Sequence, residues 1–154
     1  MWGDEVKSST GSSPSAAIAE KDVRSALARI VVSPAFRASP QLASFLSFVV
    51  EATLSGHSDR IKGYTIAVEA LGRDEKFDPQ ADPIVRVEAG RLRRALDRYY
   101  EGPGKNDPII IELPRGSYVP TMRRRNIVPD VIPPIRKFRA LLAAADLRSI
   151  NVLV

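Results

Sequence analysis

The sequence contains no cysteine and only one histidine, His57, among its 154 residues. The lack of thiols excludes disulfide bonds, thiolate zinc sites and cysteine nucleophiles. A single imidazole supplies neither the ligand set of a zinc site nor the partner of a histidine-based catalytic pair. The acidic residues between Asp74 and Asp82 lack the regular spacing of a calcium loop. We therefore expect no enzyme activity, no metal site and no cofactor.

Long apolar runs are also lacking. No segment approaches the roughly 18–20 consecutive apolar residues that a helix needs to span a bilayer. Residues 1–17 are polar and rich in serine, and they lack the apolar centre of a secretory signal. The sequence therefore predicts a disordered N-terminal segment over residues 1–17, no transmembrane segment and a cytoplasmic protein.

What the chain does have is a concentration of positive charge. Residues 83–125 contain ten Lys or Arg and five Asp or Glu, so this part carries the whole +5 net charge of the protein. A local patch of one sign attracts a polyanion and releases its counterions. The distribution suits a nucleic-acid partner, but charge alone fits a solvated basic helix face better, since such faces are common in proteins that do not bind DNA.

Apolar residues recur at helical spacing in four segments, which predicts a helix in each. These segments are residues 20–32, 39–54, 58–71 and 82–100. A cap residue followed by proline marks two of the starts, at Ser39-Pro40 and Asp82-Pro83. Gly56 and Gly72 end the second and third helices. In the last two helices, the residues expected to face the core are Ile61, Tyr64, Thr65, Val68 and Leu71, and Val85, Ala89, Leu92, Leu96 and Tyr99.

A β-hairpin is predicted after the fourth helix. Apolar and polar residues alternate from Ile109 to Leu113 as in a half-buried strand. Residues 114–117 supply the turn, and residues 118–122 form the return strand. Residues 123–154 are predicted to form a basic, proline-rich linker and then an amphipathic helix over 135–150. This tail could fold back on the domain, make a homodimer contact or lie at a membrane surface, and the first two are favoured.

Two segments carry a resemblance to a known family. They are Val85-Arg86-Val87-Glu88-Ala89-Gly90-Arg91-Leu92-Arg93-Arg94-Ala95-Leu96 and, further on, Ile-Ile-Ile-Glu-Leu-Pro-Arg-Gly-Ser-Tyr. Together they resemble the OmpR/PhoB-type winged helix-turn-helix domain of bacterial transcription regulators. The block from Phe36 to Pro120 is similar to a variant that lacks the N-terminal sheet and lies at the N-terminus of proteobacterial cyclase and tetratricopeptide-repeat proteins. The resemblance implies that residues 18–122 form one winged helix domain, which is mainly α with a small β-hairpin wing.

The function that the resemblance implies is a transcription regulator that binds double-stranded DNA. The helix over 82–100 would lie in the major groove, and the wing over 108–122 would contact phosphates or the minor groove. Arginine suits both tasks, because it binds guanine in bidentate fashion and holds phosphates. The resemblance assigns to this surface Arg86, Gly90, Arg91, Arg93, Arg94 and Arg115; helical geometry adds Arg98, and Lys62 is a candidate phosphate contact on the third helix.

An alternative function is a protein-interaction module on the same scaffold, which docks a regulatory partner instead of DNA. Glu88 and Asp97 interrupt the positive face and favour this alternative, although Glu88 is expected to act as a solvated salt-bridge partner. Gly90 also has two interpretations. Its missing side chain lets the backbone approach a ligand closely, or glycine is merely tolerated at an exposed helical site.

Overall fold

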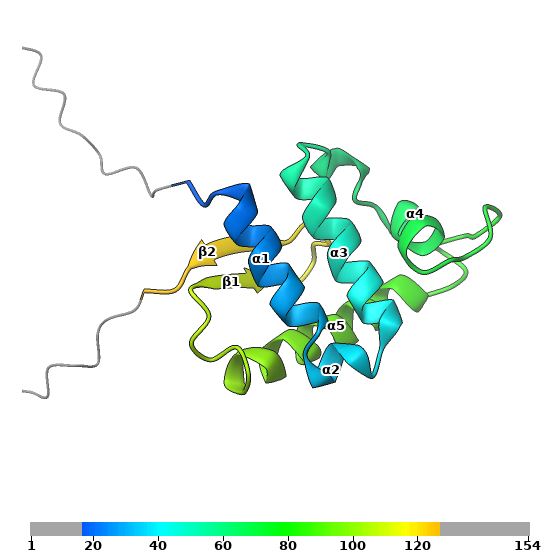
Figure 1. The fold of residues 1–154 in the computed structure, drawn as a ribbon. Coiled ribbons are helices and arrows are strands. Elements are labelled where there is room, and N and C mark those ends of the chain that lie inside the picture. The colour runs from blue at the N-terminus through cyan, green and yellow to red at the C-terminus, as the bar shows by residue number, and fades with distance from the viewer. Residues whose placement is uncertain (1–16, 127–154) are drawn as a thin grey trace, which may run out of the picture.

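The computed structural model describes residues 17–126, which form a mainly helical fold with one antiparallel two-stranded hairpin (Figure 1). The elements are α1 Glu20–Val31, α2 Pro34–Arg37, α3 Pro40–Leu54, the 3-10 turn η1 Ser58–Arg60, α4 Gly63–Thr65, the π-helical turn η2 Ile66–Ala70, α5 Ile84–Glu101, β1 Ile109–Glu112 and β2 Thr121–Arg124. The segment expected to be disordered, up to residue 16, and the linker and helix expected after residue 126 lie outside the described residues.

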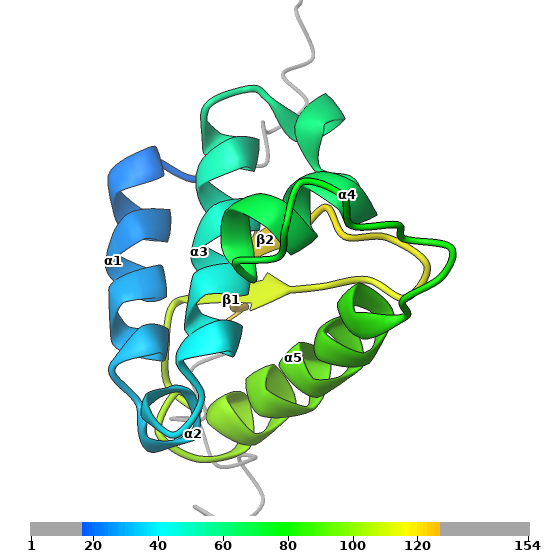
Figure 2. The same cartoon turned by 90° about the vertical axis from the view of Figure 1, so that its right-hand side faces the viewer.

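One apolar core joins the helices to the hairpin. α1 contacts α3 and β1, and α5 also contacts α3 and β1. Figure 2 shows α1 and α3 side by side, with α5 running at an angle to them. The largest fully buried apolar side chains are Phe36, Phe45, Ile30, Leu46, Ile66, Leu92, Ile109 and Ile111. Because these residues come from both the helices and β1, their packing fixes α5 relative to the hairpin.

The connection between α1 and α3 contains a short helix, whereas the sequence predicts no helix between residues 32 and 39. Pro34 occupies the first position of α2, where its missing N–H has no helical partner to lose. Ser33 Oγ donates a hydrogen bond to the Ile30 carbonyl at 2.6 Å. Phe36 is fully buried and anchors the short helix in the core.

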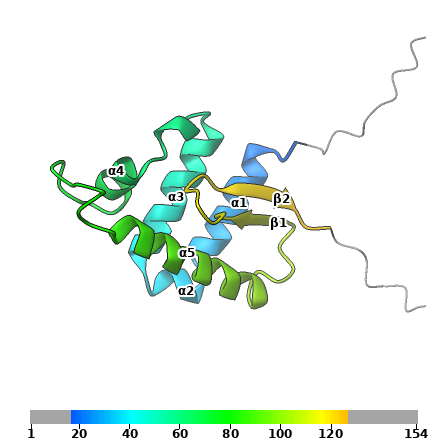
Figure 3. The same cartoon turned by 180° about the vertical axis from the view of Figure 1, so that it is seen from behind.

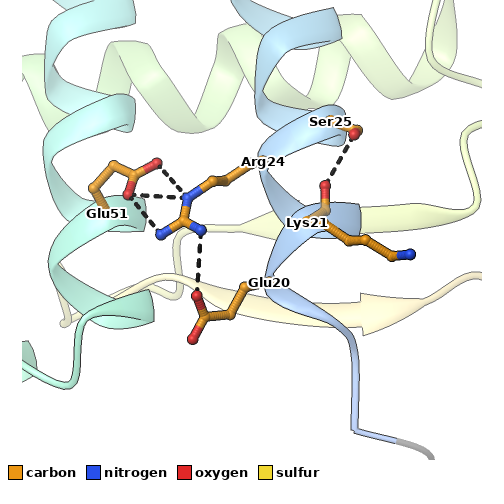
Figure 4. A network of polar contacts seen from close by, with 5 residues as sticks. All are labelled: Glu20, Lys21, Arg24, Ser25 and Glu51. Atoms are coloured by element: carbon orange, nitrogen blue, oxygen red, sulfur yellow. Dashed lines mark hydrogen bonds and ion pairs between the residues drawn. The ribbon is translucent and has the colours of Figure 1, made fainter.

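The outer surface of α1 and α3 carries an exposed ion-pair network (Figure 4). Arg24 Nε lies 3.2 Å from Glu51 Oε1, and Arg24 Nη1 lies 3.2 Å from Glu20 Oε2. The hydrogen bond to Glu51, followed by the charges of both carboxylates, raises the pKa of Arg24. Exposed pairs of this kind contribute little to stability. Their effect here is to neutralise the arginine on this face of the molecule.

α3 begins and ends where the sequence predicts, but the prediction of one continuous helix over 58–71 is wrong. The chain forms η1, opens at Lys62 (φ −132°, ψ 159°), and then forms α4 and η2. Thr65 Oγ1 accepts a hydrogen bond from the Lys62 amide at 3.0 Å and donates one to the Arg60 carbonyl. Side-chain bonds to nearby backbone groups compete with the helical hydrogen-bond pattern, which explains the break.

The break also changes which residues face the core. Tyr64, which the periodicity places inside, is 42% exposed, and its hydroxyl donates to a backbone carbonyl of the following loop at 2.9 Å. Ile66 and Ala67 are fully buried instead. Ile61 and Leu71 are buried as predicted. The irregular turns between them shift the helical phase, which a uniform period of 3.6 residues does not anticipate.

α5 lies close to its predicted range. Asp82 Oδ1 accepts a hydrogen bond from the Ile84 amide at 2.9 Å, which satisfies an N–H group that the first helical turn leaves without a partner. The five residues predicted to face the core are all buried, namely Val85, Ala89, Leu92, Leu96 and Tyr99. The opposite side of α5 is therefore the side available to a ligand.

The return strand of the hairpin starts later than predicted. β1 and β2 pair antiparallel with Ile109 opposite Arg124, whereas the sequence predicts a return strand over 118–122. Pro120 has no amide N–H to donate, and the ladder begins after it. The loop is correspondingly longer than a four-residue turn. β2 continues past residue 122, so Arg123 and Arg124 are part of the hairpin.

Candidate functional site

The outer face of α5 presents a row of arginines. Because an α-helix has 3.6 residues per turn, residues between the buried positions point away from the core. Arg86, Arg91, Arg94 and Arg98 are exposed on this side. Figure 3 shows α5 and the hairpin together on one side of the molecule, with α1 behind them. A ligand on this side therefore meets both elements.

Arg93 turns towards the hairpin loop instead of away from the protein. Its Nε donates to the Leu113 carbonyl at 3.0 Å, and its Nη2 donates to the carbonyls of Pro114 at 3.0 Å and Ser117 at 3.2 Å. A planar guanidinium suits this forked geometry. Arg93 is half-buried and acts as a positioning residue that holds the loop against α5.

The loop held by Arg93 exposes a further cation. Ser117 N donates to the Pro114 carbonyl at 3.3 Å, and Gly116 has a φ of +79°, as the third residue of a type II turn requires. Arg115 is the second residue of this turn and is exposed. The turn and α5 therefore present positive charge on adjoining surfaces.

Glu88 is buried, which corrects the prediction that it is solvated. It lies on the inner side of α5, is 2% exposed, and accepts a hydrogen bond from Arg91 Nη1 at 3.0 Å. Its predicted role as a salt-bridge partner is confirmed. The Arg91 side chain is 61% exposed, so part of it neutralises Glu88 and the rest faces solvent. Arg91 therefore adds less net charge to the outer face than its neighbours do.

Four exposed arginines of this surface have no carboxylate partner within 4.0 Å among residues 17–126. They are Arg86, Arg94, Arg98 and Arg115. In contrast, Arg123 Nη2 lies 3.0 Å from Glu112 Oε1, and the hydrogen bond between them raises the pKa of Arg123. Arg125 donates to the carbonyls of Gly104 and Asp107. α5 and the tip of the loop thus carry four exposed arginines whose charge no carboxylate within 4.0 Å offsets.

A cleft of about 860 Å³ lies between α5 and the hairpin. Along α5, its lining begins with Gly90, Arg93 and Arg94 and ends with Asp97 and Glu101. The two signs of charge are therefore separated along the helix. The hairpin side of the cleft adds Arg115, Arg123 and Arg125 as well as Glu112, so the lining as a whole carries mixed charge with an excess of arginines.

Lys62 belongs to another segment of the chain. It is exposed at the opening of the chain before α4, on a different element from the arginines, and it does not line the cleft. The structure thus places seven of the eight residues proposed for DNA binding on α5 and the adjoining loop, and Lys62 elsewhere.

A polar network that the sequence does not reveal anchors the other end of the site. The Tyr99 hydroxyl donates to Asp107 Oδ2, and Arg29 Nε lies 3.0 Å from Asp107 Oδ1. The Tyr100 hydroxyl accepts a hydrogen bond from the Ile111 amide at 2.7 Å. Burial raises the pKa of Tyr100 to about 12, and burial followed by the bond to Asp107 raises the pKa of Tyr99. These contacts join α1, the end of α5 and β1.

Neither a protein-family model, nor a curated protein, nor a solved structure matches this chain. The site is therefore interpreted from its own geometry and charge. Within residues 17–126, no helix combines the length and the apolar character needed to cross a membrane. In that same part of the chain, no three potential metal-ligating side chains gather in one place.

Proposed function

We propose that this protein is a DNA-binding transcription regulator with a winged helix-turn-helix domain. α5 is the recognition helix in the major groove, and the hairpin with its loop is the wing on phosphates or the minor groove. The observation that carries the proposal is the set of exposed arginines on α5 beside Arg115, on a loop that Arg93 holds against the helix. Charge of one sign on two adjoining elements suits a phosphate backbone.

Position suggests a role for each cation. Arg86 and Arg94 lie in the N-terminal two thirds of α5, the part of a recognition helix that contacts base edges, and either can bind guanine or a phosphate. Arg98 lies one residue beyond Asp97, which favours a phosphate contact at the margin of the surface. Arg115 at the loop tip is a second phosphate contact. Arg93 acts indirectly, by placing the loop.

The test is fluorescence anisotropy of a labelled mixed-sequence duplex at several salt concentrations. Each neutralised phosphate contributes about −0.9 to the slope of log affinity against log salt, so four arginines predict a slope of roughly −3 to −4. Arg94→Ala should make this slope shallower by about one. Arg24→Ala is the matched control, because it removes the same charge from the face formed by α1 and α3 (Figure 4).

Two results would reject this function. One is the absence of duplex binding at 50 mM salt or below, where the electrostatic contribution is large. The other is an equal loss of binding in Arg94→Ala and Arg24→Ala, because an equal loss would mean that only net charge matters.

A protein partner is the alternative occupant of the same surface. Asp97 and Glu101 in the cleft favour it, because carboxylates beside arginines match a partner of mixed charge better than DNA. This alternative predicts that the whole chain recovers a stoichiometric protein partner and that Asp97→Asn weakens that complex. It also predicts no salt-dependent binding of the duplex.

A further inference from the structure

An apolar side chain stands among the arginines of α5. Val87 is 46% exposed, and the other large apolar side chains exposed within residues 17–126 are Val32 and Tyr64. Tyr64 uses its hydroxyl in a hydrogen bond, and Val32 follows the end of α1. Of the three, Val87 alone lies on the helix that carries the proposed DNA-binding surface.

The surroundings of Val87 are cationic and open. Arg86 precedes it, and Arg91 and Arg94 follow one and two turns later on the same side of the helix. Gly90 lies between these turns, and a Cβ added to it would meet no atom nearer than Arg94 Nη1 at 3.9 Å. Val87 is therefore a small apolar spot inside an arginine surface, next to a position that has no side chain.

The major groove exposes one apolar group on its natural base edges, the 5-methyl group of thymine. A valine side chain cannot donate or accept hydrogen bonds, so it gains nothing from the polar edges of guanine, adenine or cytosine. It does gain from removing a methyl group from water. The flanking arginines supply the attraction to phosphates that brings a base edge to this spot.

We propose that Val87 contacts a thymine 5-methyl group, and that the bare backbone at Gly90 gives this group room to approach. The bound sequence then carries a thymine opposite Val87. This inference rests on the proposed DNA-binding function and adds a base preference to it.

The experiment starts from duplexes selected with the whole wild-type chain out of a random-sequence pool. Each thymine of the selected sequence is replaced in turn by deoxyuridine, which keeps the hydrogen-bonding groups and lacks only the methyl group. At one thymine of the site, the wild-type affinity should fall about fourfold, the value of one buried methyl group. Val87→Ala should bind the thymine duplex about fourfold more weakly and should not distinguish thymine from deoxyuridine there.

Val32→Ala is the control, because it truncates an exposed valine outside the surface and should keep the full thymine preference. Thermal unfolding checks that both variants fold, as expected for exposed positions. Duplex binding in which Val87→Ala keeps the same deoxyuridine sensitivity as the wild type at every position would overturn the inference and leave the DNA-binding function in place. If the selection yields no duplex that binds, both the proposed function and this inference fail.

Discussion

Nη2 of Arg93 donates a hydrogen bond at 3.2 Å to the carbonyl oxygen of Ser117, which lies 24 residues further along the chain. The same guanidinium also donates to the carbonyls of Leu113 and Pro114. One side chain of α5 therefore sets the position of the loop that carries Arg115. The proposed DNA-binding surface therefore depends on this contact as well as on the exposed arginines.

Replacing Arg93 by lysine tests this contact. Arg93→Lys keeps the charge but replaces a planar fork by a single ammonium group, so backbone carbonyls of the loop lose their donors. We expect the free energy of unfolding, measured by urea denaturation, to fall by about 1–3 kcal/mol. The matched variant Arg94→Lys changes an exposed neighbour and should stay within about 0.5 kcal/mol of the wild type. Equal stabilities of the two variants would contradict the positioning role.

Gly104 should not tolerate a side chain. A Cβ built at this position would overlap the ring of Tyr99, which is buried and bonded to Asp107 and therefore has little freedom to move aside. Gly104→Ala should lower the free energy of unfolding by about 1–3 kcal/mol, as overpacking does in a filled core. Thermal unfolding measures this change. If Gly104→Ala kept the melting temperature of the wild type, the loop around this position would adapt to the added methyl group at no cost in stability.

Gly90, which lies inside α5, is the opposite case. A Cβ there makes only an ordinary contact, with Arg94 Nη1 at 3.9 Å, and alanine is the better helix former, so Gly90→Ala should raise stability by about 0.5–1 kcal/mol. On the proposed function the added methyl group intrudes on the DNA surface, so the same variant should bind the duplex more weakly. Anisotropy and urea denaturation on one preparation separate the two effects. A variant that is more stable and binds equally well would show that glycine is merely tolerated at this site.

The buried carboxylate of Glu88 should make Arg91 more important for stability than an ordinary surface arginine. Arg91→Gln leaves Glu88 without the partner that it has at 3.0 Å, and we expect a loss of about 1–3 kcal/mol. Arg94→Gln, which breaks no ion pair, should have little effect. The double variant Glu88→Gln with Arg91→Gln should recover part of the loss, and a double-mutant cycle measures the coupling. Strictly additive losses would argue against the pair.

Stability should fall at alkaline pH because of two tyrosines. Burial raises the pKa of Tyr100 to about 12 and also raises that of Tyr99, whereas tyrosine in an unfolded chain titrates near 10. The unfolded chain therefore loses these protons first. The stabilisation is fully present below about pH 10 and is lost as the pH rises towards 12. Melting temperatures between pH 9 and pH 11.5 should show this decline.

Tyr100→Phe separates this effect from general alkaline unfolding. It removes one titrating group, so the decline should be less steep than in the wild type. It also removes the acceptor for the Ile111 amide, which should lower stability at neutral pH by about 1–2 kcal/mol. An unchanged steepness would show that Tyr100 does not take part in the alkaline transition.

The sequence predicts the parts of this fold that local signals determine. α3 and α5 have continuous apolar stripes, and their start signals act within a few positions. Pro40 opens α3, although the Ser39 side chain makes no cap hydrogen bond, and the Asp82 side chain bonds the Ile84 amide at the start of α5. The region of 58–71 has a similar stripe, but the hydroxyl of Thr65 bonds the backbone on its N-terminal side and breaks the helix. The spacing of apolar residues gives no information about these hydrogen bonds, so it cannot predict the break.

The residues of the candidate site also fall into those that the sequence places correctly and those that it does not. Helical spacing correctly places Arg86, Arg94 and Arg98 on the outer face, because exposure follows from the angle around the helix axis. It also places Arg93 on the outer face, whereas the long side chain of Arg93 turns to a loop twenty or more residues further along the chain. Likewise, the charge of Glu88 suggests a surface position, while its angle on the helix places it inside.

The three hydrogen bonds of Arg93 hold the loop against α5, so the distance between helix and loop is set before a ligand binds. A ligand that spans both elements does not have to order the loop, and that entropic cost is absent from its affinity. A fixed distance between α5 and the loop also discriminates between DNA duplexes by their shape. A DNA duplex whose groove width matches this distance binds without deformation. A duplex with a different groove width must deform, and the energy of that deformation depends on its sequence.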